Sequence, residues 1–317
     1  MILTACDVWD FARPVPKPVP DELILAAIRP KKLATVDQVI VSTIQSAYYE
    51  QDEGALWVTQ GDYYADNAPV QSTYVIRCDA NGTELDHMFC YGGGHGANFG
   101  IQRIGGVPHV WLMWDHAIDE SKVFEIVRFP YAAGTTIDRT NAGIESFDKG
   151  VAATQRVQFG IDVDGDRMVQ RLYWGGLRYR LRRLSDVVGG VDDMLAEIVA
   201  PVPHPEGDWF QGVATTGDHA YVCQGIIANN VAAPEPAAVG VYTWSAGTFD
   251  MLADADQIGR SPDGTFWGGR KKEPEGITIS RSASTGMHFA SVGVSLMDDN
   301  GNYRHEVWVY DQADTIV

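Results

Sequence analysis

The feature that most constrains the fold is an internal repeat of strand–turn–strand units. Five segments align, each opening on a polar residue that a small one usually follows, and they begin at Gln45, His95, Gln155, Gln211 and Glu275. After its start, each segment has an alternating apolar run, a tight turn and a second run, which is the pattern of a β-hairpin. The most similar pair, "ANFGIQ" and "VQFGID", is offset by 60 residues. The chain therefore uses one supersecondary unit five times.

The spacing of the repeats predicts the architecture. Successive starts lie roughly 50 to 64 residues apart, room for one four-stranded antiparallel sheet each, and this is the spacing of propeller blades. We predict an all-β fold: a five-bladed β-propeller over residues 22–317, with inner strands starting near 45, 95, 155, 211 and 275. Turn signals such as Asp79-Ala80-Asn81-Gly82, Asp164-Gly165-Asp166 and Asp298-Asp299-Asn300-Gly301 agree with it. Val191–Ile198 fits either a helix or an outer strand.

The two ends of the chain indicate how the ring closes. After Glu275 there is room for only three strands, at Gly276–Ser280, Met287–Leu296 and Tyr303–Tyr310. Glu22–Val41 precedes the first repeat and has no blade of its own, so we predict that it supplies the missing strand and closes the ring. Residues 1–21 include "ARPVPKPVP"; because proline fixes an extended backbone, we predict an N-terminal arm.

The loop "YGGGHGANFG" at 91–100 concentrates glycine around one histidine. A phosphate-binding loop needs a helix after it, whereas an alternating strand pattern follows here. We therefore interpret the loop as the entrance to the innermost strand of the second blade. Backbones crowd near a propeller axis, and glycine fits where a side chain would clash.

Charge and cysteine content narrow the classes of partner. The chain has 24 Lys+Arg against 42 Asp+Glu, a net charge of −18, which disfavours nucleic acid as a partner. A cationic ligand, a bound cation or a basic partner protein stays open. Four cysteines show no zinc-type spacing; Cys78 and Cys90 either meet across a hairpin or are buried thiols. We expect no membrane span and no signal peptide, hence synthesis in a cytoplasm.

Two segments carry a family resemblance. "STIQSAYYEQDEGALWVTQ" pairs a Gln-Ser with a hairpin ending in Thr-Gln, and "GGGHGANFGIQ" is followed by the aromatic strand "VWLMW". Both resemble signatures of the five-bladed propeller shared by receptor-binding proteins of staphylococcal phages, a teichoic-acid-associated protein and helveticin-type bacteriocins. The resemblance covers roughly residues 35–310 and is weaker in blades three to five.

This resemblance implies a phage tail or cell-envelope-binding role, with a cell-wall glycopolymer as ligand. Family members often have stem or tower domains, which we expect this chain to lack; that favours a structural tail-tip role beside direct receptor binding. By analogy, we expect other phage tail proteins as partners and the virion tail as the location. The expected assembly is a homotrimer in which the proline arm reaches a neighbouring subunit.

The five repeat starts are the first candidate site. Equivalent positions on inner strands point to the propeller axis, so we predict a polar ring of Gln45, His95, Gln155, Gln211 and Glu275 around a channel. Such a ring suits water, an ion or a sugar hydroxyl. The alternative is that these side chains bond neighbouring blades and hold the ring shut.

Two further clusters are candidates for ligand binding. Asp162, Asp164 and Asp166 have the spacing of a calcium loop but lack its distal glutamate, so a plain turn is the favoured interpretation and a structural calcium stays open as the alternative. In "RYRLRR", alternation places Arg178, Arg180 and Arg182 on one strand face. This basic patch is either ion-paired or a site for an anionic polymer or acidic neighbour.

Tryptophans are candidates for stacking on sugar rings. Four of the nine lie in strand-like runs and are predicted to pack between blades: Trp57, Trp111, Trp174 and Trp308. Trp209, before an inner strand, and Trp267, in a loop that also contains Arg270, Lys271 and Lys272, are the candidates for stacking.

Catalytic motifs are scarce. The sequence contains no GxSxG or HExxH motif. The favoured hypothesis is therefore a non-catalytic phage tail or tail-tip protein. The alternatives are a propeller hydrolase or lactonase with a channel metal on Glu275 and His95, and a secreted bacteriocin-like wall-binding protein.

Overall fold

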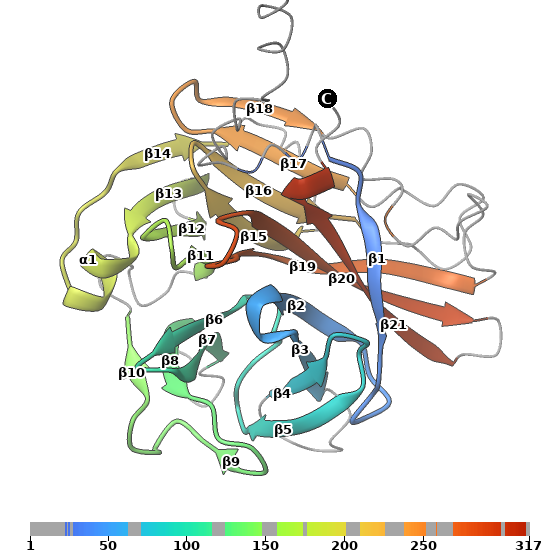
Figure 1. Ribbon diagram of the computed structural model, residues 1–317. Coiled ribbons are helices and arrows are strands. Elements are labelled where there is room, and N and C mark those ends of the chain that lie inside the picture. Colours follow the sequence, from blue (N-terminus) through green and yellow to red (C-terminus); the bar gives the residue numbers. More distant parts are fainter. Residues whose placement is uncertain are drawn as a thin grey trace, which may run out of the picture.

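The computed structural model describes residues 23, 25, 28–62, 71–115, 124–147, 157–173, 176–200, 210–225, 238–251, 258, 269–298 and 302–314. Five antiparallel sheets are arranged around a common centre (Figure 1). The structure thus confirms the predicted all-β, five-bladed propeller. Within the described residues, no helix is long and apolar enough to cross a bilayer.

The blades follow one another along the chain. Blade 1 consists of β2 (Ile44–Glu50), β3 (Ala55–Asp62), β4 (Ser72–Asp79) and β5 (Glu84–Cys90). Blade 2 consists of β6 (Phe99–Ile104), β7 (Val107–Asp115), β8 (Phe124–Pro130) and β10 (Glu145–Ser146). Blade 3 consists of β11 (Val157–Asp162), β12 (Arg167–Tyr173), β13 (Leu177–Arg183) and β14 (Ala196–Val199).

The last two blades repeat the plan. Blade 4 consists of β15 (Phe210–Thr216), β16 (His219–Gln224), β17 (Ala238–Thr243) and β18 (Thr248–Met251). Blade 5 consists of β19 (Gly269–Arg281), β20 (His288–Asp298), β21 (Tyr303–Asp311) and, outermost, β1 (Lys31–Val36). Two short 3₁₀ turns, η2 (Gln51–Glu53) and η4 (Gln312–Asp314), follow β2 and β21.

The N-terminal strand closes the ring, as predicted. β1 pairs antiparallel with β21, with Lys31 opposite Val309 and Val36 opposite His305. Upstream of it, Leu23 is buried, and its carbonyl accepts a hydrogen bond from the Tyr221 hydroxyl of blade 4. The chain's first described residues therefore join blade 4 to blade 5.

Two details differ from the simplest expectation. Blade 1 carries a fifth strand, β9 (Thr136–Ile137), which pairs in parallel with β5. In blade 3, the ambiguous segment forms the outer strand β14, and the helix α1 (Leu184–Gly189) precedes it. Gly190 caps the C-terminus of the helix, and its left-handed φ of 70° is one that favours glycine.

The core is divided into five apolar clusters, one between each pair of neighbouring blades. Trp57 of blade 1 packs with blade 2, Trp111 of blade 2 with blade 3, and Trp308 of blade 5 with blade 4. Their packing between blades agrees with the prediction, whereas Trp174 lies outside the described residues. Because each sheet buries both faces, the ring is one continuous packed body.

Glycines allow the inner strands to approach each other closely. A Cβ on Gly160 of β11 would lie 2.1 Å from the Val213 carbonyl oxygen of β15. A Cβ on Gly212 would lie 2.7 Å from the Gly276 Cα of β19. At Gly276, where φ is +62°, a Cβ would meet the Ser46 Oγ of β2 at 2.5 Å. Glycine at these positions is therefore required by blade convergence.

Hydrogen bonds across blade boundaries also hold neighbouring blades together. The Asn98 side-chain carbonyl accepts the Phe159 amide of blade 3 at 3.0 Å. The Thr278 hydroxyl of blade 5 donates to the Ala47 carbonyl of blade 1 at 2.5 Å. The Thr59 hydroxyl donates to the Gly96 carbonyl at 2.8 Å and so holds the glycine loop against blade 1. A strand, not a helix, follows that loop.

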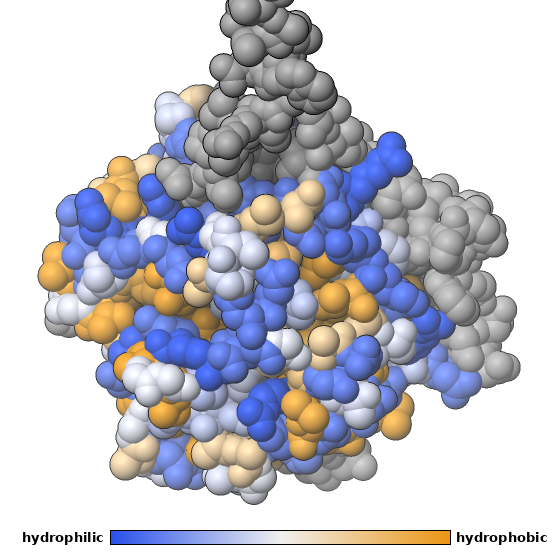
Figure 2. All heavy atoms as spheres, viewed as in Figure 1, coloured by the Kyte–Doolittle hydropathy of each residue, from blue (hydrophilic) through white to orange (hydrophobic). Residues whose placement is uncertain are grey.

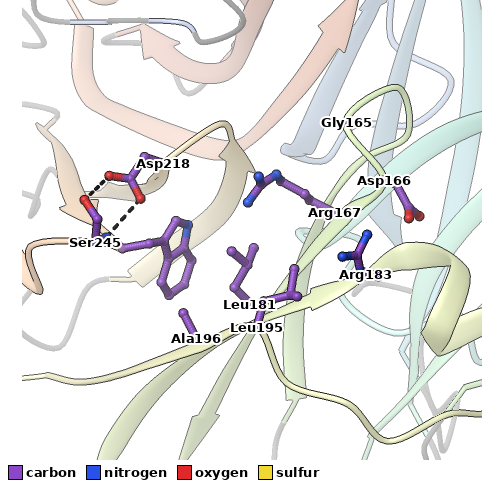
Figure 3. A pocket seen from close by; sticks show the side chains of 10 residues that line it. Gly165, Asp166, Arg167, Leu181, Arg183, Leu195, Ala196, Asp218 and Ser245 are labelled. Atoms are coloured by element: carbon purple, nitrogen blue, oxygen red, sulfur yellow. Dashed lines mark hydrogen bonds between the residues drawn. The ribbon is translucent and has the colours of Figure 1, made fainter.

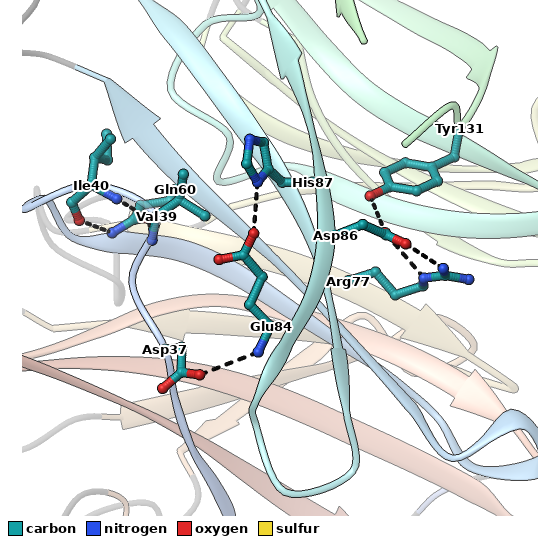
Figure 4. A network of polar contacts seen from close by, with 9 residues as sticks. All are labelled: Asp37, Val39, Ile40, Gln60, Arg77, Glu84, Asp86, His87 and Tyr131. Carbon is teal, nitrogen blue, oxygen red and sulfur yellow. Dashed lines mark hydrogen bonds and ion pairs between the residues drawn. The ribbon is translucent and has the colours of Figure 1, made fainter. Parts of the chain in front are cut away.

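Connecting segments are tied to the outside of blade 1 (Figure 4). Asp86 on β5 binds Arg77 on β4 and accepts a hydrogen bond from the Tyr131 hydroxyl at 2.6 Å, which anchors the segment after β8. The Gln60 side chain accepts the Val39 amide at 3.1 Å. These contacts fix the path from the closing strand into blade 1.

The described cysteines are free thiols. Cys78, Cys90 and Cys223 are buried, and Cys78 and Cys90 form no disulfide. Burial is the main cause that raises the pKa of Cys78 to about 12. Among the alternatives left open by the sequence, the structure shows buried thiols.

Acid is expected to weaken the closing blade through His305. This residue is fully buried on β21, its Nδ1 lies 3.3 Å from the Ser295 hydroxyl, and burial lowers its pKa from 6.5 to about 4. The unfolded chain takes up a proton near pH 6.5, but the folded chain does so only near pH 4. Stability is therefore complete above pH 6.5 and is lost as the pH falls toward 4, by about 3 kcal/mol.

The measurement compares the free energy of unfolding of the wild type and His305→Gln between pH 7 and pH 4. We expect the difference between the two proteins to shift in favour of the variant as the pH falls. Parallel curves across this range would show that His305 does not control acid stability.

Candidate functional site

Three of the predicted channel residues lie on innermost strands, each at or beside a bulge. Gln45 lies at a β-bulge of β2, Gln211 lies at a bulge of β15, and Glu275 adjoins the Gly276 bulge of β19. His95 lies in the glycine loop before β6. Gln45 and Glu275 are buried. Gln155 lies outside the described residues, so a ring of five stays a prediction.

Side chains of blades 4 and 5 meet in one polar contact. The Gln211 amide donates to Glu273 Oε1 at 3.0 Å and to the Gly225 carbonyl at 3.3 Å. Burial lowers the pKa of His95, and the Glu273 carboxylate opposes that shift. The geometry thus brings together Gln211 and Glu273. The sequence reasoning selected Glu275 instead of Glu273, although residues two apart share a strand face.

The other two ring candidates have local contacts. The Gln45 amide donates to the Thr43 hydroxyl at 2.6 Å, and among the described residues its side-chain oxygen has no hydrogen-bond partner. The Glu275 carboxylate contributes to the raised pKa of the Cys223 thiol, whose main cause is burial.

The aspartate-rich segment is a capped turn. Asp162 Oδ1 accepts the Gly165 amide at 2.9 Å, and Asp166 accepts the Ser185 amide and hydroxyl, each at 2.7 Å, at the start of α1. Desolvation and then the Asp162 carboxylate raise the pKa of Asp164. In the described parts of the chain, no group of three or more His, Cys, Asp or Glu residues is arranged to hold a metal ion.

The basic patch on β13 is ion-paired within its own blade. Arg178 and Arg180 bind the two oxygens of Glu197 on β14 at 2.5 and 2.6 Å. Arg182 is buried and donates to the Val191 and Asp193 carbonyls. The arginines share one strand face as predicted, and they hold the outer strand and the loop before it.

A cleft between blades 3 and 4 is the candidate site that the sequence did not indicate (Figure 3). Its volume is about 440 Å³. The lining comes from the β11–β12 turn, β13, the start of β14 and the two turns of blade 4, and its side chains include Arg167, Arg183, Leu181, Leu195, Asp218 and Trp244. Since separate turns of two blades meet there, no contiguous motif marks the cleft.

The surface beside the cleft is partly apolar. Figure 2 shows apolar side chains near α1 and the following loop, on the left of the view. Val188, Val191, Met194 and Leu195 are each more than a third exposed. Leu195 belongs to both the exposed surface and the cleft lining.

The two predicted stacking residues cannot be placed. Trp209 and Trp267 lie outside the described residues, as do the side chains of Arg270, Lys271 and Lys272. Trp244, at the end of β17, is the cleft's tryptophan and was not singled out from the sequence.

Comparison with known proteins agrees with this architecture. The chain is 24% identical over 292 residues to a Bacillus subtilis (strain 168) protein named as a candidate "major teichoic acid biosynthesis protein C", covering 89% of this chain and 62% of that protein. The fold matches the tail fiber of Staphylococcus aureus phage P68 with a TM-score of 0.72 and 20% identity, over 92% of this chain and 54% of the fiber. The chain therefore spans little more than half of each relative's length.

A family model gives the assignment. Residues 44–309 match the phage 5-bladed beta propeller receptor binding platform domain. The matched range runs from the start of β2 into β21 and so includes strands of all five blades, but not the closing strand β1. The resemblance seen in the first two repeats is confirmed, and the chain belongs to the family of phage five-bladed propeller receptor-binding platforms.

Proposed function

We propose that this chain is a receptor-binding propeller of a phage tail, that it attaches to a glycopolymer of the host cell envelope, and that it does so without catalysis. The observation that carries the proposal is the family match over residues 44–309, which includes strands of every blade. The similarity in fold to a phage tail fiber supports the same role.

The structure supports a binding role through its rigidity. Five apolar clusters and the close glycine contacts hold the blades in fixed positions, so turns from different blades present side chains at constant spacing. A preorganised surface of this kind loses little entropy when it binds a flexible polymer. We further expect other tail proteins as partners, a homotrimer as the assembly, and the virion tail as the location.

The test uses purified protein and isolated host cell walls. We expect saturable binding that survives protease treatment of the walls and disappears when their phosphodiester-linked glycopolymers are removed by acid extraction. Binding that withstands the extraction would contradict a phosphodiester-linked receptor, and binding that is lost after protease treatment alone would contradict a glycopolymer receptor. Light scattering of the same sample tests the homotrimer.

A further inference from the structure

Two arginines line the cleft between blades 3 and 4 from paired positions on neighbouring strands. Arg167 on β12 and Arg183 on β13 are register partners, so their side chains leave the same face of the sheet side by side. Both line the cleft. Like charges directly opposite on neighbouring strands destabilise a sheet unless an opposite charge lies between them.

Within the described residues, Arg183 has one carboxylate at the limit of ion-pair distance and Arg167 has none. The Arg183 guanidinium lies 4.0 Å from the Asp186 carboxylate, and the Arg183 side chain is 57% exposed. Within the described residues, no hydrogen bond or ion pair engages the Arg167 side chain. On the same strand, Arg178 and Arg180 are instead matched by Glu197 at 2.5 and 2.6 Å.

The two carboxylates of the cleft are already engaged elsewhere. Asp166 binds the amide and hydroxyl of Ser185. Asp218 accepts the amide of Ser245 at 2.9 Å and also its hydroxyl, as Figure 3 shows. In a chain with a net charge of −18, the cleft therefore combines two adjacent cations with acids that cap turns.

The cleft also has apolar lining, of which Leu181 and Trp244 are largely buried in the cluster between blades 3 and 4. Leu181, Leu195 and Ala196 line it beside the Trp244 indole, whose Nε1 donates to the Thr215 hydroxyl at 3.3 Å. This bond fixes the ring in place. Apolar and aromatic walls pack against the C–H faces of sugar rings, and a volume of about 440 Å³ is in the range of small-molecule sites.

We propose that this cleft is an anion-binding subsite for the receptor polymer. The acidic group of an anionic saccharide lies between Arg167 and Arg183, and its sugar or polyol carbons lie against Trp244 and the leucines. This subsite rests on the proposed glycopolymer-binding function and assigns its charge recognition to two residues. Guanidinium groups bind both phosphate and carboxylate in this way, so a phosphodiester polymer and a uronic acid polymer share the required chemistry.

The experiment measures binding of two soluble probes, poly(glycerol phosphate) and polygalacturonate, by calorimetry at low salt, with neutral dextran as a blank. We expect the wild type to bind one acidic probe and the double variant Arg167→Gln/Arg183→Gln to bind it at least ten-fold more weakly. Loss of the phosphate probe identifies a phosphodiester ligand, and loss of the uronate probe identifies a carboxylate ligand. A wild type that binds neither probe would overturn the proposal.

The matched control is Arg103→Gln. Arg103 lies at the end of an inner strand of blade 2, where it pairs with Glu50, so its removal changes the charge near a hairpin turn without touching the cleft. We expect its affinity to stay within two-fold of the wild type. An equal loss in this control, or an unchanged affinity in the double variant, would show that the cleft is not the site. Arg167→Lys/Arg183→Lys keeps the charge but loses the paired guanidinium geometry, and should fall between the two.

These outcomes are separable from the proposed function. If wild-type protein binds host walls and the double variant binds them equally well, the receptor role stands and this subsite is wrong. If no wall is bound but the soluble probe still requires the two arginines, the subsite stands and the receptor role is wrong.

Discussion

The substitution Gly160→Ala is expected to lower the free energy of unfolding by about 3 kcal/mol or more. The new Cβ would lie 2.1 Å from the Val213 carbonyl oxygen and 2.8 Å from the Ala214 Cα. Both atoms belong to the backbone of β15, so no side-chain rotation relieves the clash and blades 3 and 4 must separate. Urea unfolding at neutral pH, followed by tryptophan fluorescence, measures the loss.

The control for this substitution is Gly189→Ala. Gly189 is the last residue of α1, and the nearest atom to a Cβ there is Val191 Cγ2 at 4.0 Å. Alanine favours a helical backbone over glycine, so this variant should match the wild type or exceed it slightly. Equal stability of the two alanine variants would mean that the inner strands do not converge as described.

The substitution Val36→Asp is expected to disrupt ring closure. We expect it to destabilise the protein by about 4 kcal/mol or more, which is enough to unfold a marginally stable domain. Val36 on β1 is 4% exposed and packs in the cluster between blades 5 and 1 with Val58, Ile76 and Val307. A carboxylate there has no cation in the cluster, so it must either take up a proton or expel the strand. Size-exclusion chromatography and limited proteolysis will detect the open ring as an expanded, cleavable species.

Thr35→Asp provides the same chemical change on the opposite face of the strand. Thr35 is exposed, and Arg304 donates to its hydroxyl at 3.3 Å, so an aspartate there gains a cationic neighbour. We expect this variant to elute and resist protease like the wild type. If Val36→Asp also behaves as wild type, β1 is not the strand that closes the propeller.

Strand periodicity and repeat spacing were sufficient to predict the fold because both follow from backbone geometry. A blade needs about four strands, and a chain that ends one strand short must recover it from its other end, as β1 does. The parallel strand β9 was not predicted, since Thr136–Ile137 is too short to show alternation. The buried Leu23 was equally unmarked, because its burial depends on Tyr221 in a distant blade.

Site residues were harder to predict because they depend on contacts between blades. The polar starts of the repeats correctly marked Gln211 as an inner-strand residue. Its partner is Glu273, not Glu275, and this choice depends on how far β15 and β19 are shifted along each other. Alternation in the sequence predicted that the arginines of the basic patch share one strand face. It did not predict their partner, Glu197, because that residue lies on the next strand. The Arg167–Arg183 pair emerges only from the register of β12 and β13.

Adsorption competition tests the central claim, that this propeller binds the phage receptor. Host cells are incubated with purified protein, the phage whose genome encodes the chain is added, and the unadsorbed particles are counted. We predict that saturating wild-type protein leaves at least ten times more phage unadsorbed, while the Arg167→Gln/Arg183→Gln protein blocks poorly. Unchanged adsorption in the presence of saturating wild-type protein would contradict a receptor-binding role.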